Sequence, residues 1–143
     1  MNKNNAPKLP AMDHTFDITV TGQETGVTYV GRFKYRRATL GQRTRIDVMR
    51  TRLNGDLETL DSEVKEFSQA IAHLRFTIVE SPDWWTASNY GSELYDGNVI
   101  AEVYNQAMDF ESKWKEQVFG ADAAKTMAGD AANAAQRSVE PTA

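Results

Sequence analysis

The stretch Ile78-Val79-Glu80-Ser81-Pro82-Asp83-Trp84-Trp85 decides the fold, because it separates two long amphipathic helical patterns. Proline pushes the residue before it out of the helical region, so the first pattern must end before Pro82. Two of the three tryptophans follow directly, and each can bury on the order of 150–250 Å². The stretch predicts a hydrophobic corner that locks two helices together. The alternative is an exposed aromatic anchor for a partner, since tryptophan is enriched at interface hot spots.

Helical periodicity flanks this corner on both sides. Before it, apolar side chains recur every three or four residues over 60–78, which predicts an amphipathic helix. After it, a similar stripe covers 99–118, with Asp96 as the expected N-cap and Gly120 as the terminator. We expect these two helices to pack as an antiparallel pair, with the tryptophan corner at one end.

A shorter helix is predicted upstream, from Thr39 to about Leu53. Thr39 and Gln42 have the spacing of a capping box, in which each side chain bonds the other residue's backbone N–H. Asn54-Gly55 is a typical C-terminal stop. This helix is the first of three in the predicted order.

Two stretches of alternating polarity precede the helices. Phe16, Ile18 and Val20 alternate with polar residues, and a second run over 27–36 separates aromatic residues from cations. The glycine-bounded turn at 22–26 predicts that the two runs pair as an antiparallel β-hairpin. The fold class is therefore predicted to be α+β, an N-terminal hairpin followed by three helices.

The length of 143 residues fits one domain, which we place at 14–120. Residues 1–13 are expected to be a flexible arm, and residues 121–143 a flexible alanine-rich tail, because both contain few large apolar groups. No apolar run approaches the roughly 20 residues of a membrane span. The first residues also lack the apolar core of a signal peptide. A soluble cytoplasmic protein is expected.

The net charge of −4 conceals a basic block at 32–52. This block has a formal charge of +7, which leaves −11 for the rest of the chain. It indicates either a contact surface for an acidic partner or charge complementarity within the molecule. Nucleic acid is disfavoured as the ligand, because the hairpin's aromatic side chains lie opposite its cations and the acidic remainder would repel a polyanion.

No arrangement of residues indicates catalysis or metal binding. The chain has no cysteine, and its two histidines, His14 and His73, have no partner at a known motif spacing. Acids near the start of the second helix are explained by its dipole. The glycines form no phosphate-binding loop. We expect no enzymatic activity, no cofactor and no metal.

Several segments, in their order and spacing, resemble the tail assembly chaperones of tailed bacteriophages. The resemblance covers about residues 15–119, and the Pro-Asp-Trp-Trp corner is its most distinctive part. It lies in residues 31–35, 39–47 and 52–55, in Ala72-His73-Leu74, in residues 81–85 and 96–104, and in Phe110-Glu111.

This resemblance implies a non-enzymatic protein of the host-cell cytoplasm that binds the tape measure protein and helps recruit tail tube subunits. We expect an amphipathic segment of the tape measure protein to lie against apolar surface left by the helices. The expected contacts are aromatic anchors and basic residues that orient acidic partner surface, namely Trp84, Trp85, Phe110, Trp114, Arg32, Lys34, Arg36 and Arg43.

Two other functions remain open at this point. A structural virion component, such as a head decoration or tail-associated protein, would also suit a hairpin, short helices and mobile ends. A nucleic-acid-binding regulator would use the basic block. Self-association is compatible with each, because an isolated hairpin needs cover for its apolar face.

Overall fold

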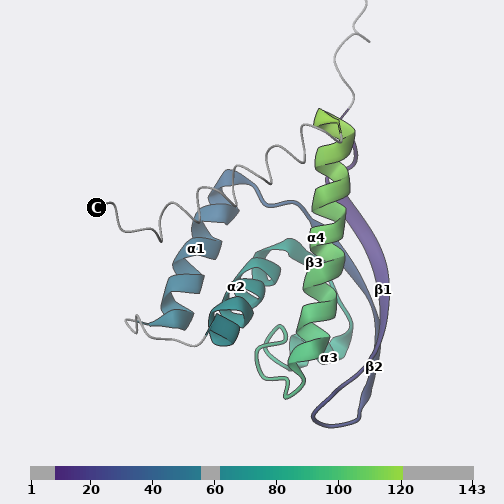
Figure 1. Ribbon diagram of the computed structural model, residues 1–143, viewed down its shortest axis with the longest axis vertical. Helices are drawn as coiled ribbons and strands as arrows, with labels where there is room; N and C mark the ends of the chain where they lie inside the picture. Colours follow the sequence, from purple (N-terminus) through teal and green to yellow (C-terminus); the bar gives the residue numbers. More distant parts are fainter. Residues whose placement is uncertain (1–8, 56–61, 121–143) are drawn as a thin grey trace, which may run out of the picture. The chain divides into compact units, whose positions relative to one another are not determined.

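The computed structural model describes residues 9–55 and 62–120 (Figure 1). The fold is α+β, with a three-stranded antiparallel sheet in the order β1-β2-β3. Of the flexible arm predicted at 1–13, residues 1–8 lie outside the described residues, and Asp13 is the first residue of β1; the whole flexible tail predicted at 121–143 also lies outside them. The elements in chain order are β1 (Asp13–Thr21), β2 (Thr28–Arg36), α1 (Leu40–Asn54), α2 (Ser62–Thr77), β3 (Ile78–Glu80), α3 (Asp83–Ala87) and α4 (Gly97–Phe119).

The chain falls into two compact units. Residues 12–108 form one unit, which contains the sheet, α1, α2, α3 and the first half of α4. The described residues of the other unit are 9–11 and 109–120. The predicted single domain at 14–120 stays a prediction. Within residues 9–55 and 62–120, no helix combines the length and the apolar character that crossing a membrane requires.

The β1–β2 hairpin puts its apolar side chains on one face. Phe16 pairs with Phe33 and Ile18 with Gly31, and the two phenylalanine rings stack with centroids 5.6 Å apart. Phe16, Ile18 and Phe33 are buried, and so is Tyr35 one step along the same face. The face is fixed because side chains alternate along a strand, so any slip by one residue would expose all four.

Two elements were missed by the sequence prediction, β3 and α3. The predicted second helix stops at Thr77, because the β-branched pair Ile78-Val79 favours a strand and Pro82 forbids further helix. Strand β3 pairs antiparallel with β2, placing Ile78 opposite Tyr35. Residues 83–87 then form a single short helix. The described residues therefore hold four helices rather than three.

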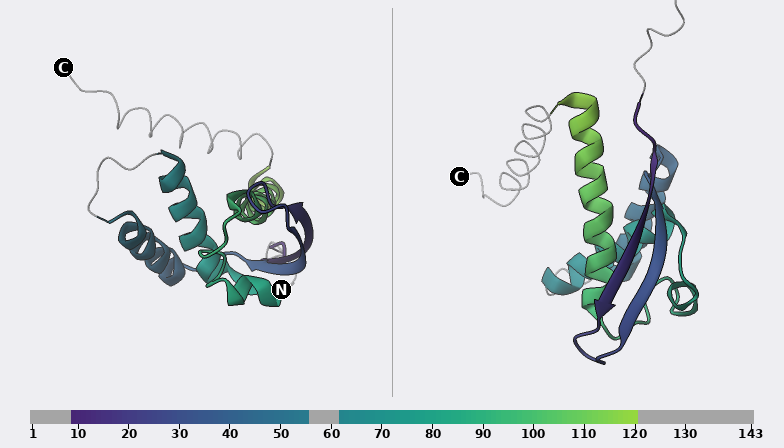
Figure 2. Two further views of the ribbon diagram at one scale, coloured as in Figure 1. Left: turned by 90° about the horizontal axis from the view of Figure 1, so that it is seen from below. Right: turned by 90° about the vertical axis from the view of Figure 1, so that its right-hand side faces the viewer.

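The predicted antiparallel pairing of the second and third helices is not confirmed. α2 packs along α1 (Figures 1 and 2), and the Gln42 side chain of α1 donates to the carbonyl oxygen of Phe76 at 3.3 Å. α2 meets α4 through side chains, including His73 edge-on to Tyr104 at 5.9 Å. The reason is β3, which carries the chain to the sheet after α2 instead of turning it directly into the next helix.

The start of α4 is joined to the tip of the hairpin by Asp96. One carboxylate oxygen accepts from the backbone N–H groups of Glu24 and Thr25 at 2.7 and 3.0 Å, and the other accepts from the Thr25 hydroxyl at 2.5 Å. Asn98 adds bonds to Gln23 and Thr21. Asp96 directly precedes α4, at the position expected for its N-cap, and its side chain binds the hairpin turn.

Candidate partner-binding surfaces

Trp84 closes the part of the β2 edge that β3 does not reach. β3 pairs with Lys34 and Tyr35, and farther along β2 the Val30 carbonyl accepts a hydrogen bond from Trp84 Nε1 at 3.0 Å. The indole also lies against Tyr29, with ring centroids 4.9 Å apart. The half-buried ring thus occupies a place that a longer β3 would otherwise fill.

Trp85 belongs to the core of the corner. It is only 1% exposed and packs edge-on against Phe33 with centroids 5.2 Å apart. Gly91 lies against its other side, at a φ of 86°, and a Cβ there would be 2.7 Å from the indole ring. Gly31 is matched in the same way to Pro82. Two glycines therefore leave the space into which the corner packs.

The four predicted aromatic anchors differ in how much surface they present. Trp84 and Trp85 lie together, with ring centroids 6.1 Å apart. Phe110 and Trp114 belong to the second half of α4, where Trp114 is buried and Phe110 is half-buried. Trp85 offers no exposed ring and Trp84 is half-buried, so the bracing interpretation of the corner has the stronger support. Partner contact through these residues stays a prediction.

Three of the four predicted basic contacts are paired across the hairpin. Arg32 makes two bonds to the Asp17 carboxylate, at 2.8 and 3.2 Å. Lys34 and Arg36 approach Asp13 at 3.8 and 3.6 Å. The hydrogen bond from Arg32 lowers the pKa of Asp17 below its usual value. Internal complementarity, one of the two interpretations of the basic block, therefore holds for this ribbon.

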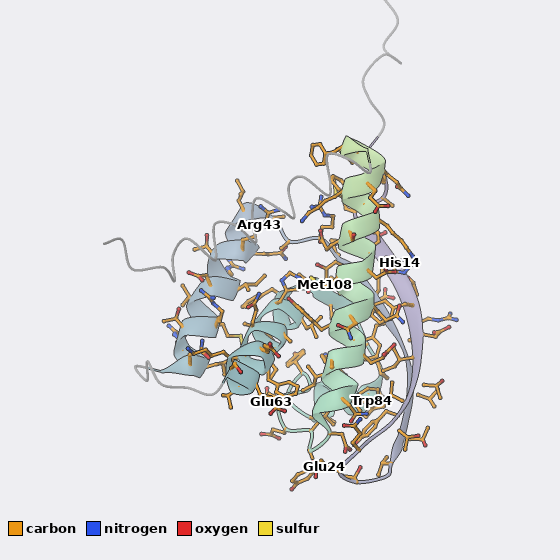
Figure 3. All side chains as sticks on the ribbon, in the orientation of Figure 1. His14, Glu24, Arg43, Glu63, Trp84 and Met108 are labelled. Atoms are coloured by element: carbon orange, nitrogen blue, oxygen red, sulfur yellow. The ribbon has the colours of Figure 1, made fainter. Side chains whose placement is uncertain are left out.

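The other cations of the basic block lie mainly on α1. Arg43 is exposed there, and Figure 3 shows it well separated from Trp84. Arg50 pairs with Asp47 at 2.5 Å. Arg45 and Arg52 make no ion pair with any residue in the described ranges. Within residues 12–108, the residues proposed from sequence thus do not converge on one site.

α1 borders a groove that sequence reasoning did not identify. Its volume is about 620 Å³. Val48 and Leu53 within it are 47% and 44% exposed, and no residue of α1 is buried. Its signal in the sequence is the weak apolar stripe that Val48, Met49 and Leu53 form on this helix. The lining consists of Thr44, Arg45, Val48, Met49, Arg52, Leu53, Arg75, Phe76 and Asn89.

His73 is half-buried and packs against Tyr35. Its Nε2 lies 2.8 Å from the Tyr35 hydroxyl, and its ring stacks on Tyr35 with centroids 5.8 Å apart. Within residues 9–55 and 62–120, no group of three or more His, Cys, Asp or Glu side chains is placed to hold a metal ion.

Comparisons of the chain with protein families, with curated proteins and with solved structures give no match.

Proposed function

We propose that this chain is a phage tail assembly chaperone, which acts in the host-cell cytoplasm by transient contacts with other proteins. Its partners in this proposal are the tape measure protein and the tail tube subunits. The order and spacing of the segments that resemble this family are one support. The proposal involves no covalent chemistry and no cofactor.

The observation that carries the proposal is the surface of α1. A helix normally covers its apolar stripe by packing it on the core. α1 has a complete capping box and 15 residues, yet none of them is buried. Leu40, Val48 and Leu53 are all exposed. A well-formed helix that leaves apolar side chains uncovered is suited to hold a partner segment for a time and release it.

The direct test is co-expression of the full chain with the tape measure protein of the same phage. We expect the tape measure protein to become more soluble and to be recovered with the tagged chain in a pull-down. The control is the tape measure protein expressed alone at the same level. Unchanged solubility together with no recovery would reject the proposal.

A structural virion component is the second candidate. It is supported by the hydrogen bonds that join the hairpin turn to Asp96 at the start of α4. Mass spectrometry of purified particles separates the two functions. A chaperone is absent or scarce in the finished particle, whereas a decoration or tail-associated protein is present in stoichiometric amounts. A stoichiometric signal would replace the chaperone proposal with the virion one.

A further inference from the structure

The geometry of α1 defines which of its side chains face the groove. An α-helix has 3.6 residues per turn, so Gln42, Met49 and Leu53 lie near one line along it. Gln42 bonds the Phe76 carbonyl on α2, so this line faces α2. Met49 is half-buried and Leu53 is exposed. The line is therefore covered only in part.

A second line runs beside the first, along the groove. It consists of Arg45, Val48 and Arg52, spaced three and four residues apart. Arg45 and Arg52 are seven residues apart, about 10 Å along the helix axis. Both are exposed, and neither forms an ion pair with a described residue. The line thus presents an apolar side chain between two available guanidinium groups.

The opposite wall of the groove is held in place by contacts of its own. The Arg75 guanidinium lies over the Tyr90 ring at 3.6 Å, and it donates to the Asn89 side chain at 3.3 Å. Phe76 beside it supplies apolar surface. Among the described residues, the lining contains three arginines and no acidic residue. The groove is therefore apolar along its floor and positive along its rims.

We propose that this groove binds an amphipathic helix of a partner protein, with an apolar stripe flanked by carboxylates about two turns apart. Helix-in-groove recognition uses anchors at such spacings. Arg45 and Arg52 would each take a carboxylate, since guanidinium groups bind carboxylates through two parallel hydrogen bonds. Val48, Met49 and Leu53 would cover the apolar stripe. The partner's identity as the tape measure protein rests on the proposed function.

Nucleic acid fits the same surface less well. A single strand binds through phosphates and through bases stacked on aromatic rings. The Tyr90 ring already carries Arg75 on one face, and the remaining floor is aliphatic or half-buried. Apolar side chains such as Val48 gain nothing from a sugar–phosphate backbone. An amphipathic protein helix with acidic flanks can pair with the arginines and cover the apolar floor.

The test uses the full chain and two synthetic helical peptides of about 20 residues. Both have the same leucine stripe, and their flanking positions are all Glu in one peptide and all Lys in the other. Fluorescence anisotropy should show binding of the Glu peptide and none of the Lys peptide. Arg45→Glu with Arg52→Glu should weaken the Glu peptide at least about tenfold.

Two further variants separate a groove from general attraction. Lys65→Glu with Lys115→Glu makes the same charge change at two exposed residues that do not line the groove, and should alter affinity by less than about threefold. Val48→Lys should weaken binding although it adds positive charge, because it removes apolar floor. Equal loss in both double variants, or tighter binding by Val48→Lys, would overturn the proposal. Circular dichroism confirms that each variant is folded.

The remaining outcomes each decide one question. A single-stranded oligonucleotide that binds more tightly than the Glu peptide, and loses affinity in Arg45→Glu with Arg52→Glu, would overturn the protein-helix proposal in favour of nucleic acid. Tape measure capture that persists in that variant would reject the groove and leave the chaperone function standing. Peptide binding by the normal chain, without capture of the tape measure protein, would support the groove and reject that function.

Discussion

At the scale of single residues, Gly22 is the described glycine at which an added Cβ would come closest to a neighbour, the Asp96 side chain. A Cβ at residue 22 would overlap the Asp96 carboxylate. That carboxylate cannot retreat without losing its bonds to Glu24 and Thr25. Glycine is needed here for space alone, because residue 22 is not among the glycines with positive φ.

We therefore expect Gly22→Ala to lower the free energy of unfolding by about 1–3 kcal/mol, the usual cost of inserting atoms into a packed site. Urea denaturation followed by circular dichroism measures it. Gly41→Ala is the matched control, because a Cβ at residue 41 meets nothing within 4 Å. It should be neutral or stabilising by up to about 1 kcal/mol, since alanine favours the helix. Equal effects of the two changes would contradict the crowding.

Asp96 also predicts how stability depends on pH. The Thr25 hydroxyl, followed by the backbone N–H groups of Thr25 and Glu24, holds the pKa of this carboxyl below its usual value. The unfolded chain therefore binds a proton first as pH falls, from about pH 4 downward. The stabilisation is complete above that range and is lost as pH drops through the lower, folded-state pKa.

The corresponding experiment compares the normal chain with Asp96→Asn at pH 7 and at about pH 3. The normal chain should have the higher Tm at pH 7, and the difference should narrow in acid because protonation removes the same charged interaction. In a Thr25→Val background the Tm difference between Asp96 and Asn at this position should also be smaller, because the hydrogen bond from the Thr25 hydroxyl to the carboxylate is lost. A difference that stays constant across this pH range would show that the carboxylate's charge is not what matters.

The two tryptophans are expected to respond differently to substitution. Trp85→Ala should cost about 3–5 kcal/mol, because it leaves a large cavity in the core. Trp84→Phe should cost only about 0.5–1.5 kcal/mol, since it removes the hydrogen bond to Val30 and retains an aromatic ring. Chemical denaturation gives both values. If Trp84→Phe proved the more damaging change, the assignment of Trp85 to the core would be wrong.

At the scale of elements, α1 depends on its caps more than the other long helices do. It has no buried residue to fix it, so its ends carry a larger share of its stability. The Thr39 hydroxyl accepts from the Gln42 N–H at 3.2 Å, and the Gln42 side chain accepts from the Thr39 N–H at 2.9 Å. These are the bonds expected from the sequence.

Thr39→Ala should therefore destabilise α1 by about 0.5–2 kcal/mol. Hydrogen exchange of the amides at 40–54 measures this locally, and they should exchange faster than in the normal chain. Thr44→Ala is the control, because its hydroxyl bonds the Leu40 carbonyl inside the helix and alanine is the better helix former. Faster exchange in Thr44→Ala alone would point away from the cap.

Local signals account for what the sequence could predict at this scale. Alternation predicted β1 and β2, periodicity predicted α2 and α4, and the capping box predicted α1, because all three signals are set by neighbours within a few residues. β3 was not predicted, because Ile78 continues the apolar stripe of α2 and because its pairing partner Tyr35 lies far away in sequence. α3 has five residues, too few for a period of 3.6 to be recognised.

At the scale of the whole molecule, contacts between residues far apart in sequence form the candidate surfaces. The residues around Asp96 predict a helix N-cap. They do not predict the hairpin turn that its side chain binds, because that turn lies far away in sequence. The pairing of Arg32 with Asp17 was accessible in principle, because both lie on the polar face and directly opposite in the register. The groove beside α1 required knowing that Phe76 and Asn89 come together across a strand and a short helix.

Charge is unevenly distributed over the described residues as a result. The cations of the β-hairpin form ion pairs with Asp13 and Asp17. Arg45 and Arg52 on α1 form no ion pair with a described acid. Reversing both therefore should change the salt dependence of partner capture, while reversing Lys65 and Lys115 should not. Pull-downs at about 50 mM and about 300 mM NaCl measure this. Identical salt dependence in the two variants would contradict the assignment.

Trp84 has a consequence for how these molecules behave when crowded together. An uncovered strand edge can recruit strands from other chains and so begin a fibre. The Val30 carbonyl is already engaged by the Trp84 indole, so it is not offered to a neighbouring molecule. A sheet therefore cannot extend from one molecule to the next through this carbonyl while Trp84 keeps its place.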